Sequence, residues 1–131
     1  MALPNLINTA YSYGVTKVVD LSTSWQSVTG NAGGDMTNTG VIPTDYSAKV
    51  HTLVIANIDG TNAADVYVIL HNASTATNFY LAHTLSVPAD SSLVVISNDT
   101  PIWLDEADEI RCLASANSDL TATCSFTLFS D

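Results

Sequence analysis

The sequence predicts an all-β fold, a single antiparallel β-sandwich or jelly-roll-like domain with an extended N-terminal arm. In the last segment, residues 120–130, apolar side chains alternate with Thr and Ser, which is the two-residue period of a strand with one buried face. Similar β-rich segments recur roughly every ten residues with turn-forming residues between them, a spacing typical of sandwiches and jelly rolls. No segment has the periodicity of an amphipathic helix. The chain of 131 residues is long enough for one domain with a core.

The first third of the chain differs in composition from the rest. Val15 to Ser22 (VTKVVDLS) is a plausible strand, whereas Gly30 to Gly40 (GNAGGDMTNTG) is small, polar and glycine-rich. Such a segment cannot bury enough apolar surface to become ordered alone. We therefore expect residues 1–44 to form an arm with a strand and a Gly-rich loop, and residues 45–131 to form the sandwich domain. Contacts with neighbouring subunits are one way to hold such an arm.

Two β-branched segments, Val50 to Ile58 and Ala64 to His71, follow the arm. The turn at residues 59–62 (Asp-Gly-Thr-Asn) predicts a hairpin between them, because Asp-Gly tolerates the positive φ of a tight turn. Both segments are apolar on both faces, so we expect both faces to be covered, either by an overlying arm or at a subunit interface. The interface candidates are Val15, Val18, Trp25, Tyr67, Ile69 and His71.

The rest of the chain predicts five more strands. Their expected ranges are Asn78 to Val87, Ser92 to Ser97, Ile102 to Leu104, Asp108 to Ser115, and Leu120 to Ser130. The alternation in the last strand predicts an inward face made of Leu120, Ala122, Cys124, Phe126 and Leu128.

Cys112 and Cys124 are the two cysteines and form one candidate pair. A hairpin turning at residues 117–119 would place them opposite each other on the buried face. They would then be either a cross-strand disulfide or two small buried thiols. The N-terminus lacks the basic and apolar regions of a secretory signal, and this favours the thiols.

The charge balance argues against several classes of partner. Thirteen acidic residues stand against three Lys and Arg, for a net charge of −10. Binding to nucleic acid or to an anionic membrane rests on Lys and Arg, so neither partner is expected. No apolar segment approaches the ~20 residues needed to cross a bilayer, so we expect a soluble chain. The low charge content favours a secreted, surface or virion protein over an ordinary cytosolic enzyme.

Four sequence motifs occur in an order that resembles a known family. They are AKVHTLVIANIDGTNAADVYVIL, STATNFYLAHTLSVPADSSLVVI, PIWLDEADEIRCLASANSDLTATCSF and a short acidic tail. From about Tyr46 to Asp131, the chain resembles small β-sandwich structural proteins encoded in the head and tail gene clusters of tailed bacteriophages. One departure is Ala107, in the acidic turn, where the family pattern leads us to expect Gly.

The resemblance implies a virion component assembled in the host cytoplasm. Its expected role is a capsid decoration (cement) protein that binds the major capsid protein lattice and stabilises the head. The alternatives are a tail or neck accessory protein and a receptor- or glycan-binding knob. Trp25 and Trp103 could form a sugar-stacking platform for such a knob, but the apolar neighbours of Trp103, Ile102 and Leu104, favour a position half-buried against the core.

The sequence offers no convincing catalytic or metal-binding constellation, so we predict neither an enzyme nor a cofactor. There is no Gly-x-Ser-x-Gly motif, and both cysteines lie in strand interiors. Four carboxylates crowd residues 105–109 and could bind Ca²⁺, but the pattern of a calcium loop is missing and a solvated turn is favoured. His51, His71 and His83 lie in three different strands, and surface or interface positions are favoured over metal ligation.

We expect a homo-oligomer, with a trimer favoured, formed through strand faces near Val50 to His71. Acidic copies repel one another, so association must come from apolar burial rather than from salt bridges.

Overall fold

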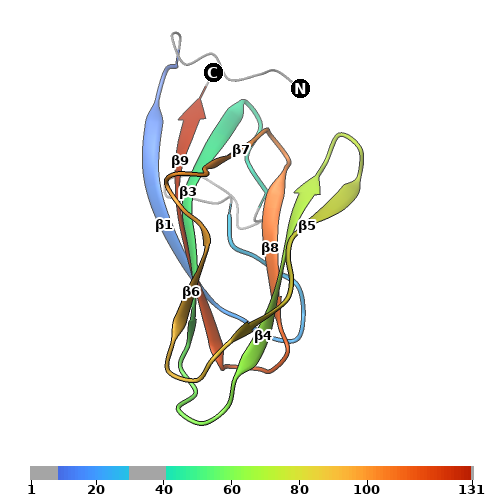
Figure 1. Cartoon of the computed structure of the whole chain (residues 1–131). Coiled ribbons are helices and arrows are strands. Elements are labelled where there is room, and N and C mark those ends of the chain that lie inside the picture. Colours follow the sequence, from blue (N-terminus) through green and yellow to red (C-terminus); the bar gives the residue numbers. More distant parts are fainter. Residues whose placement is uncertain (1–8, 30–40, 131) are drawn as a thin grey trace.

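The computed structural model describes residues 9–29 and 41–130, which form two antiparallel sheets packed face to face (Figure 1). Sheet A has the order β1 (Ser12–Asp20), β9 (Leu120–Ser130), β3 (Tyr46–Asn57), β6 (Ser92–Ile96), and β7 (Ile102–Leu104) also pairs with β3. Sheet B has the order β2 (Gln26–Ser27), β8 (Glu109–Ala114), β4 (Ala64–Asn72), β5 (Thr77–Val87). The described residues contain no helix, and therefore none long and apolar enough to span a membrane. The predicted all-β, jelly-roll-like sandwich is confirmed.

Strand β9 supplies the centre of the core. Its five predicted inward residues, Leu120 to Leu128 at every second position, are at most 1% exposed. The Thr and Ser residues between them are only partly buried, as the alternation predicts. On each side β9 has a long partner, β1 and β3, so its backbone groups are paired along both edges.

The predicted hairpin at residues 59–62 is wrong, because β3 lies in sheet A and β4 in sheet B. Each strand directs one apolar face into the core from its own side, so the connection is an arch between the sheets. The buried side chain of Asn57 holds the arch. Its Nδ2 donates to the carbonyl oxygens of Asn62 (3.0 Å) and Val87 (2.9 Å), and its Oδ1 accepts the backbone N–H of Asp59 (2.9 Å).

The predicted hairpin at residues 117–119 is also wrong, since β8 belongs to sheet B and β9 to sheet A. Cys112 and Cys124 therefore enter the core from opposite sheets rather than from paired strands. Both are fully buried free thiols. Burial raises the pKa of Cys112 and raises that of Cys124 to about 12, so neither is a reactive thiolate at neutral pH.

The expectation of an N-terminal arm separate from the sandwich does not hold for residues 12–29. Strand β1 pairs with β9 along its whole length, from Ser12 opposite Phe129 to Asp20 opposite Thr121. Leu21 is also part of the core. These residues belong to the sandwich because β9 would otherwise have an unpaired edge. The Gly-rich segment 30–40 lies outside the described residues.

The acidic turn explains why glycine was expected at position 107. Ala107 has φ of 70°, a left-handed conformation that side chains other than glycine adopt at a cost. Its backbone N–H donates to the carbonyl oxygen of Ile42 (2.8 Å), which ties the turn to the segment before β3.

Candidate interaction surface

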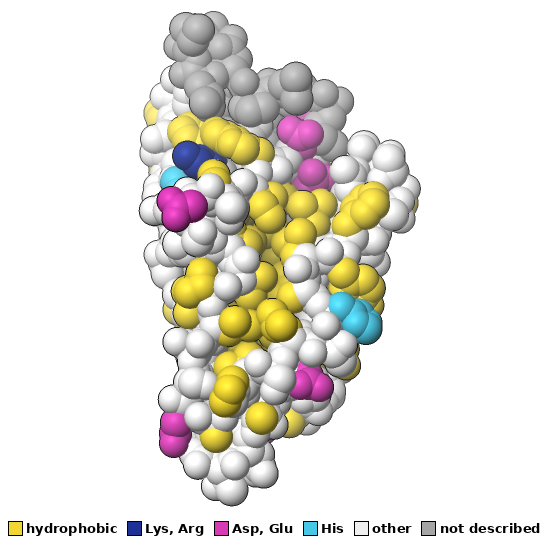
Figure 2. All heavy atoms as spheres, in the orientation of Figure 1, with side chains coloured by type: hydrophobic (Ala, Val, Ile, Leu, Met, Phe, Trp, Pro, Cys, Tyr) yellow, Lys and Arg dark blue, Asp and Glu magenta, His cyan; other side chains and the backbone are white. Residues whose placement is uncertain are grey.

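Large apolar side chains are exposed over both sheets and at their ends. Figure 2 shows hydrophobic side chains gathered down the middle of one face, between β6 of sheet A and β5 of sheet B. The exposed large apolar residues are Tyr11, Tyr13, Val18, Trp25, Ile58, Phe79, Tyr80, Leu81, Leu85, Val94 and Trp103. Four of them lie on β5, which makes that strand the richest in exposed apolar side chains.

Strand β5 lies at an edge of sheet B. Among the described residues its only strand partner is β4, so the backbone groups on its other side have no strand to pair with. Phe79 is 53% exposed, Tyr80 55% and Leu81 37%, so apolar side chains reach solvent on both faces of the strand. None of the 11 residues of β5 carries a formal charge at neutral pH.

An aromatic face lies on the outside of sheet B and consists of Trp25, Tyr67, Tyr80 and His83. The ring of His83 meets Tyr80 edge-on, with centroids 4.7 Å apart, and Tyr67 at 5.4 Å. Trp25, just before β2, reaches to 6.5 Å from Tyr80 on β5. The rings thus connect residues from opposite edges of sheet B.

Beside the aromatic face, Ile69 explains why β4 is apolar on both sides. It lies opposite Arg111 of β8 and Tyr80 of β5, outside the core cluster, yet it is only 3% exposed. The outer apolar side chain of β4 is therefore buried within a single chain.

The six predicted interface candidates have different environments in the fold. Val15 packs against the core and Ile69 is buried, so both offer little surface to a partner. Val18 is 61% exposed on the outside of sheet A, and Trp25 is 38% exposed on sheet B. Tyr67 and His71 are partly exposed on β4. The single chain does not test their role at an interface.

Sequence reasoning missed the exposed residues Phe79, Tyr80 and Leu81 as candidates. The available signal was a run of three large apolar residues with no charge nearby. Such a run places apolar side chains on both faces of a strand, and only the fold shows that this strand is an edge.

Two carboxylates of residues 105–109 make contacts within the fold. Asp108 is 5% exposed, and its two carboxylate oxygens accept the backbone N–H groups of Ala73 (2.9 Å) and Asp105 (3.2 Å). Glu109 forms an ion pair with Arg111. Among residues 9–29 and 41–130, no group of three or more metal-ligating side chains could hold an ion.

Each histidine has its own hydrogen-bond partner in a different place. His51 Nε2 bonds Thr127 Oγ1 at 2.7 Å. His71 Nδ1 bonds Asn78 Oδ1 at 2.7 Å, and His83 bonds its neighbour Thr84. These pairings are those of surface histidines with polar neighbours.

The two tryptophans do not form a common platform. Trp103 stacks on Phe129 of sheet A, with centroids 5.7 Å apart, and Lys49 Nζ lies 5.8 Å from its ring. Trp25 belongs to the aromatic face of sheet B. Any sugar-stacking surface would therefore be built on one tryptophan and the tyrosines beside it.

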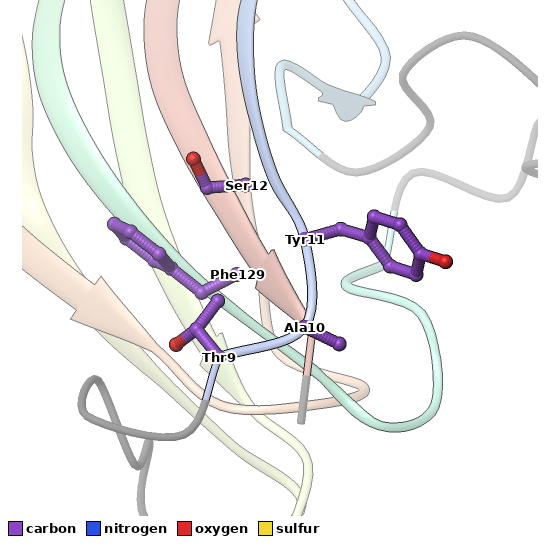
Figure 3. Close-up of a pocket in the computed structure, with 5 residues that line it drawn as sticks. All are labelled: Thr9, Ala10, Tyr11, Ser12 and Phe129. Carbon is purple, nitrogen blue, oxygen red and sulfur yellow. The ribbon is translucent and has the colours of Figure 1, made fainter.

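A hollow near the start of β1 carries no catalytic group. Figure 3 shows its lining residues, with the rings of Tyr11 and Phe129 directed to opposite sides. Thr9, Ala10 and Ser12 complete the lining. Among the described residues that line the hollow there is no acid or base beside the hydroxyl groups, so these residues alone do not form a nucleophilic site.

No protein-family model and no curated protein matches the chain. Three solved structures have similar folds. One, described as Bacillus endospore appendages that form a family of disulfide-linked pili, has a TM-score of 0.49 and 15% identity, covering 99% of this chain and 98% of that one. The virus-like particle of the extra small virus of the prawn Macrobrachium rosenbergii has a TM-score of 0.40 and 10% identity, covering 98% and 87%. The T13 IBDV viral particle has a TM-score of 0.41 and 8% identity; the match covers 99% of this chain but 35% of the other. Likeness at this level does not carry an argument about function.

Proposed function

We propose that this chain is a self-assembling structural subunit. The observation that carries the proposal is the exposed, uncharged apolar strand β5, in a sandwich whose described residues hold no group of three or more metal-ligating side chains. Exposed apolar surface of this kind marks a contact with another molecule. A structural role accounts for such a surface without requiring chemistry that the chain does not display.

The charge of the chain defines how such an assembly behaves. With a net charge of −10, two copies repel each other when they come within about a Debye length, and this length shortens as salt is added. Burial of apolar side chains must then supply the attraction. We expect association to strengthen as salt concentration rises, which is the opposite of an assembly held by salt bridges.

Within this class, we propose a virion component, a capsid decoration protein that binds the major capsid protein lattice and forms trimers. The support is the sequence resemblance to small phage β-sandwich proteins, which spans residues 46–131. A compact acidic domain without fibrous repeats suits the outside of a capsid. A neck or tail accessory protein is the alternative within the same class.

Sedimentation velocity over a wide range of protein and salt concentrations tests self-assembly. The expected result is a reversible shift to larger species that increases with both concentrations. Negative-stain electron microscopy of the same samples should show particles of regular size or shape. A chain that stays monomeric throughout, with no ordered particle, would contradict the proposal.

Binding to a glycan is a second candidate, favoured by the aromatic face of sheet B. Trp25 and Tyr80 are 38% and 55% exposed and lie side by side, an arrangement on which sugar rings can stack. A glycan array probed with the wild-type chain and with Tyr80→Ala tests it. Trp103→Ala, on the other sheet, is the matched control. Binding that is lost in Tyr80→Ala and kept in Trp103→Ala would favour this role over assembly.

A further inference from the structure

The four sheet edges differ in how well they resist pairing with another strand. Natural sheets protect edges by keeping them short or by placing a charge, often Lys, so that it points inward. In sheet B, the edge strand β2 has only two residues. In sheet A, the edge away from β1 is divided between β6, with five residues, and β7, with three. Strand β1 has nine residues but carries Lys17, which points into the sandwich. Strand β5, with 11 residues and no formal charge at neutral pH, has neither protection.

The first half of β5 is the part that is suited to pairing. The register with β4 is shifted on either side of Val68, and Thr84 has φ of 50°, so the second half is irregular. From Thr77 to Tyr80 each residue lies opposite a successive residue of β4, from Asn72 back to Ile69. Among the described residues, an incoming strand therefore meets a regular free edge over residues 77–80.

From these observations we propose that β5 pairs with β5 of a second copy, antiparallel and about a two-fold axis, so that sheet B continues across both chains. The inference rests on the proposed self-assembly and names one surface that carries it. The unpaired backbone N–H and C=O groups of an edge strand can hydrogen-bond to another extended backbone, so the binding segment is a strand. The other edge strands of this chain are short or, in β1, carry the inward-pointing Lys17. The strand of a second copy that can pair with β5 is therefore β5 itself.

The charge distribution favours this self-pairing. The β4 residues opposite 77–80 are Asn72, His71, Leu70 and Ile69, none of which is acidic. Two acidic side chains lie next to this part of β4, Glu109 opposite His71 and Asp108 bonded to the N–H of Ala73, but they are only 3% and 5% exposed. Two copies with ten excess negative charges each can therefore approach here with little like-charge contact. At the far end of β5, Ser86 lies opposite Asp65, which places a negative charge beside that half of the strand.

The contact is small by the standard of stable complexes. Pairing along a four-residue edge buries less surface than the ~1,200 Å² typical of stable protein pairs. We therefore expect a weak, rapidly exchanging contact in solution, which an engineered disulfide can trap.

Cysteine scanning tests the geometry directly. Single substitutions to Cys at each of residues 77–81 are oxidised by glutathione disulfide in the full-length chain, and covalent dimers are measured on non-reducing gels. Ile58→Cys and Val94→Cys are matched controls, since these side chains are 63% and 58% exposed but lie off β5. The native cysteines are buried and react little, so background is low. We expect dimer at one or two adjacent positions at the axis, where Cα atoms come within disulfide range, and little at the others. Equal or greater dimer from the controls would overturn the proposal.

A charge substitution provides the second measurement. Tyr80→Lys places like charges near each other across the axis, which should weaken association by roughly twofold to fivefold, since like charges facing across strands are unfavourable. Val94→Lys, on sheet A, should leave association unchanged, and urea melts of both variants check that they fold.

The combined outcomes separate this inference from the proposed function. If the wild-type chain assembles and Tyr80→Lys assembles equally well, the β5 pairing is wrong and self-assembly stands. A wild-type chain that never associates, in sedimentation or in the cysteine scan, overturns both.

Discussion

Lys17 of β1 lies directly opposite Cys124 of β9, so its side chain points into the sandwich, where Nζ donates to the carbonyl oxygen of Thr29 (3.2 Å). Burial lowers the pKa of Lys17, and the negative charge of Glu109 acts against this effect. A strand added beside β1 would bury this ammonium group further. The position of Lys17 therefore guards the longer edge of sheet A.

Replacing Lys17 should change self-association more than it changes the free energy of unfolding. In Lys17→Met the desolvated charge is lost and the length of the side chain is kept, so the free energy of unfolding should change by less than about 1 kcal/mol. Association should increase, because β1 becomes a second unguarded edge. Thr16→Met adds an apolar side chain beside it without removing the charge and is the control. Sedimentation velocity compares the two, and equal association in both would show that Lys17 does not protect the edge.

The core of β9 offers a clear contrast between neighbouring positions. Phe126 is 1% exposed, and Phe126→Ala should lower the free energy of unfolding by about 3 to 5 kcal/mol, as large-to-small core substitutions do. Thr123 lies on the outer face and is partly exposed, so Thr123→Ala should cost less than about 0.5 kcal/mol. Urea melts measure both, and similar midpoints for the two variants would mean that the faces of β9 are assigned wrongly.

Replacing Ala107, which has a left-handed backbone conformation in the acidic turn, with glycine should stabilise the protein. Ala107→Gly should raise the free energy of unfolding by about 0.5 to 1 kcal/mol, because glycine adopts φ near 70° without a steric cost. Ala107→Val should lower it, since a β-branched side chain is strongly disfavoured there. Thermal melts of both variants would reject this account of the turn if the shifts had the same sign.

The pH dependence of the same turn follows from Asp105. Partial burial raises the pKa of its carboxyl group above 3.8, and the neighbouring charges of Asp108 and Glu106 add to the effect. Ionisation is thus harder in the folded state. The favourable contribution of the protonated group is complete below the unfolded pKa and is lost as pH rises through the folded pKa.

Asp105→Asn keeps the shape of the side chain and removes this ionisation. The variant should gain stability over wild type as pH rises from about 4 to 7, by less than about 1 kcal/mol because the group is only partly buried. High salt should reduce the gain. Urea melts across this pH range measure it, and a gain that is constant with pH would exclude Asp105 as the cause.

The strands could be predicted from the sequence because their signal is local. The expected bounds of β7 and β9 agree with the structure, and the alternation in β9 identified the buried side chains correctly. The pairing of strands could not be predicted in the same way. An Asp-Gly turn allows a tight reversal within one sheet and also an arch between two, and only the second directs the apolar faces of both β3 and β4 into a common core.

The candidate surface was harder to predict for a related reason. Apolar residues on both faces of a strand indicate that it is covered, but they do not tell whether the cover comes from the same chain. Ile69 is buried within its own chain, whereas Tyr80, opposite it, is more than half exposed. The difference depends on which strand forms the edge of sheet B, and this follows from long-range pairing.

The central position of β9 also affects when the chain can fold. Among the strand pairs of residues 9–29 and 41–130, only β4 with β5 joins consecutive strands, while β1 and β3 both pair with β9. During synthesis sheet A cannot be completed until residues 120–130 have left the ribosome, and folding dominated by such distant contacts is slow. Until then, the β4–β5 hairpin is the one local unit that can form. A chain that stops before residue 120 can therefore display β5 while lacking its complete sandwich.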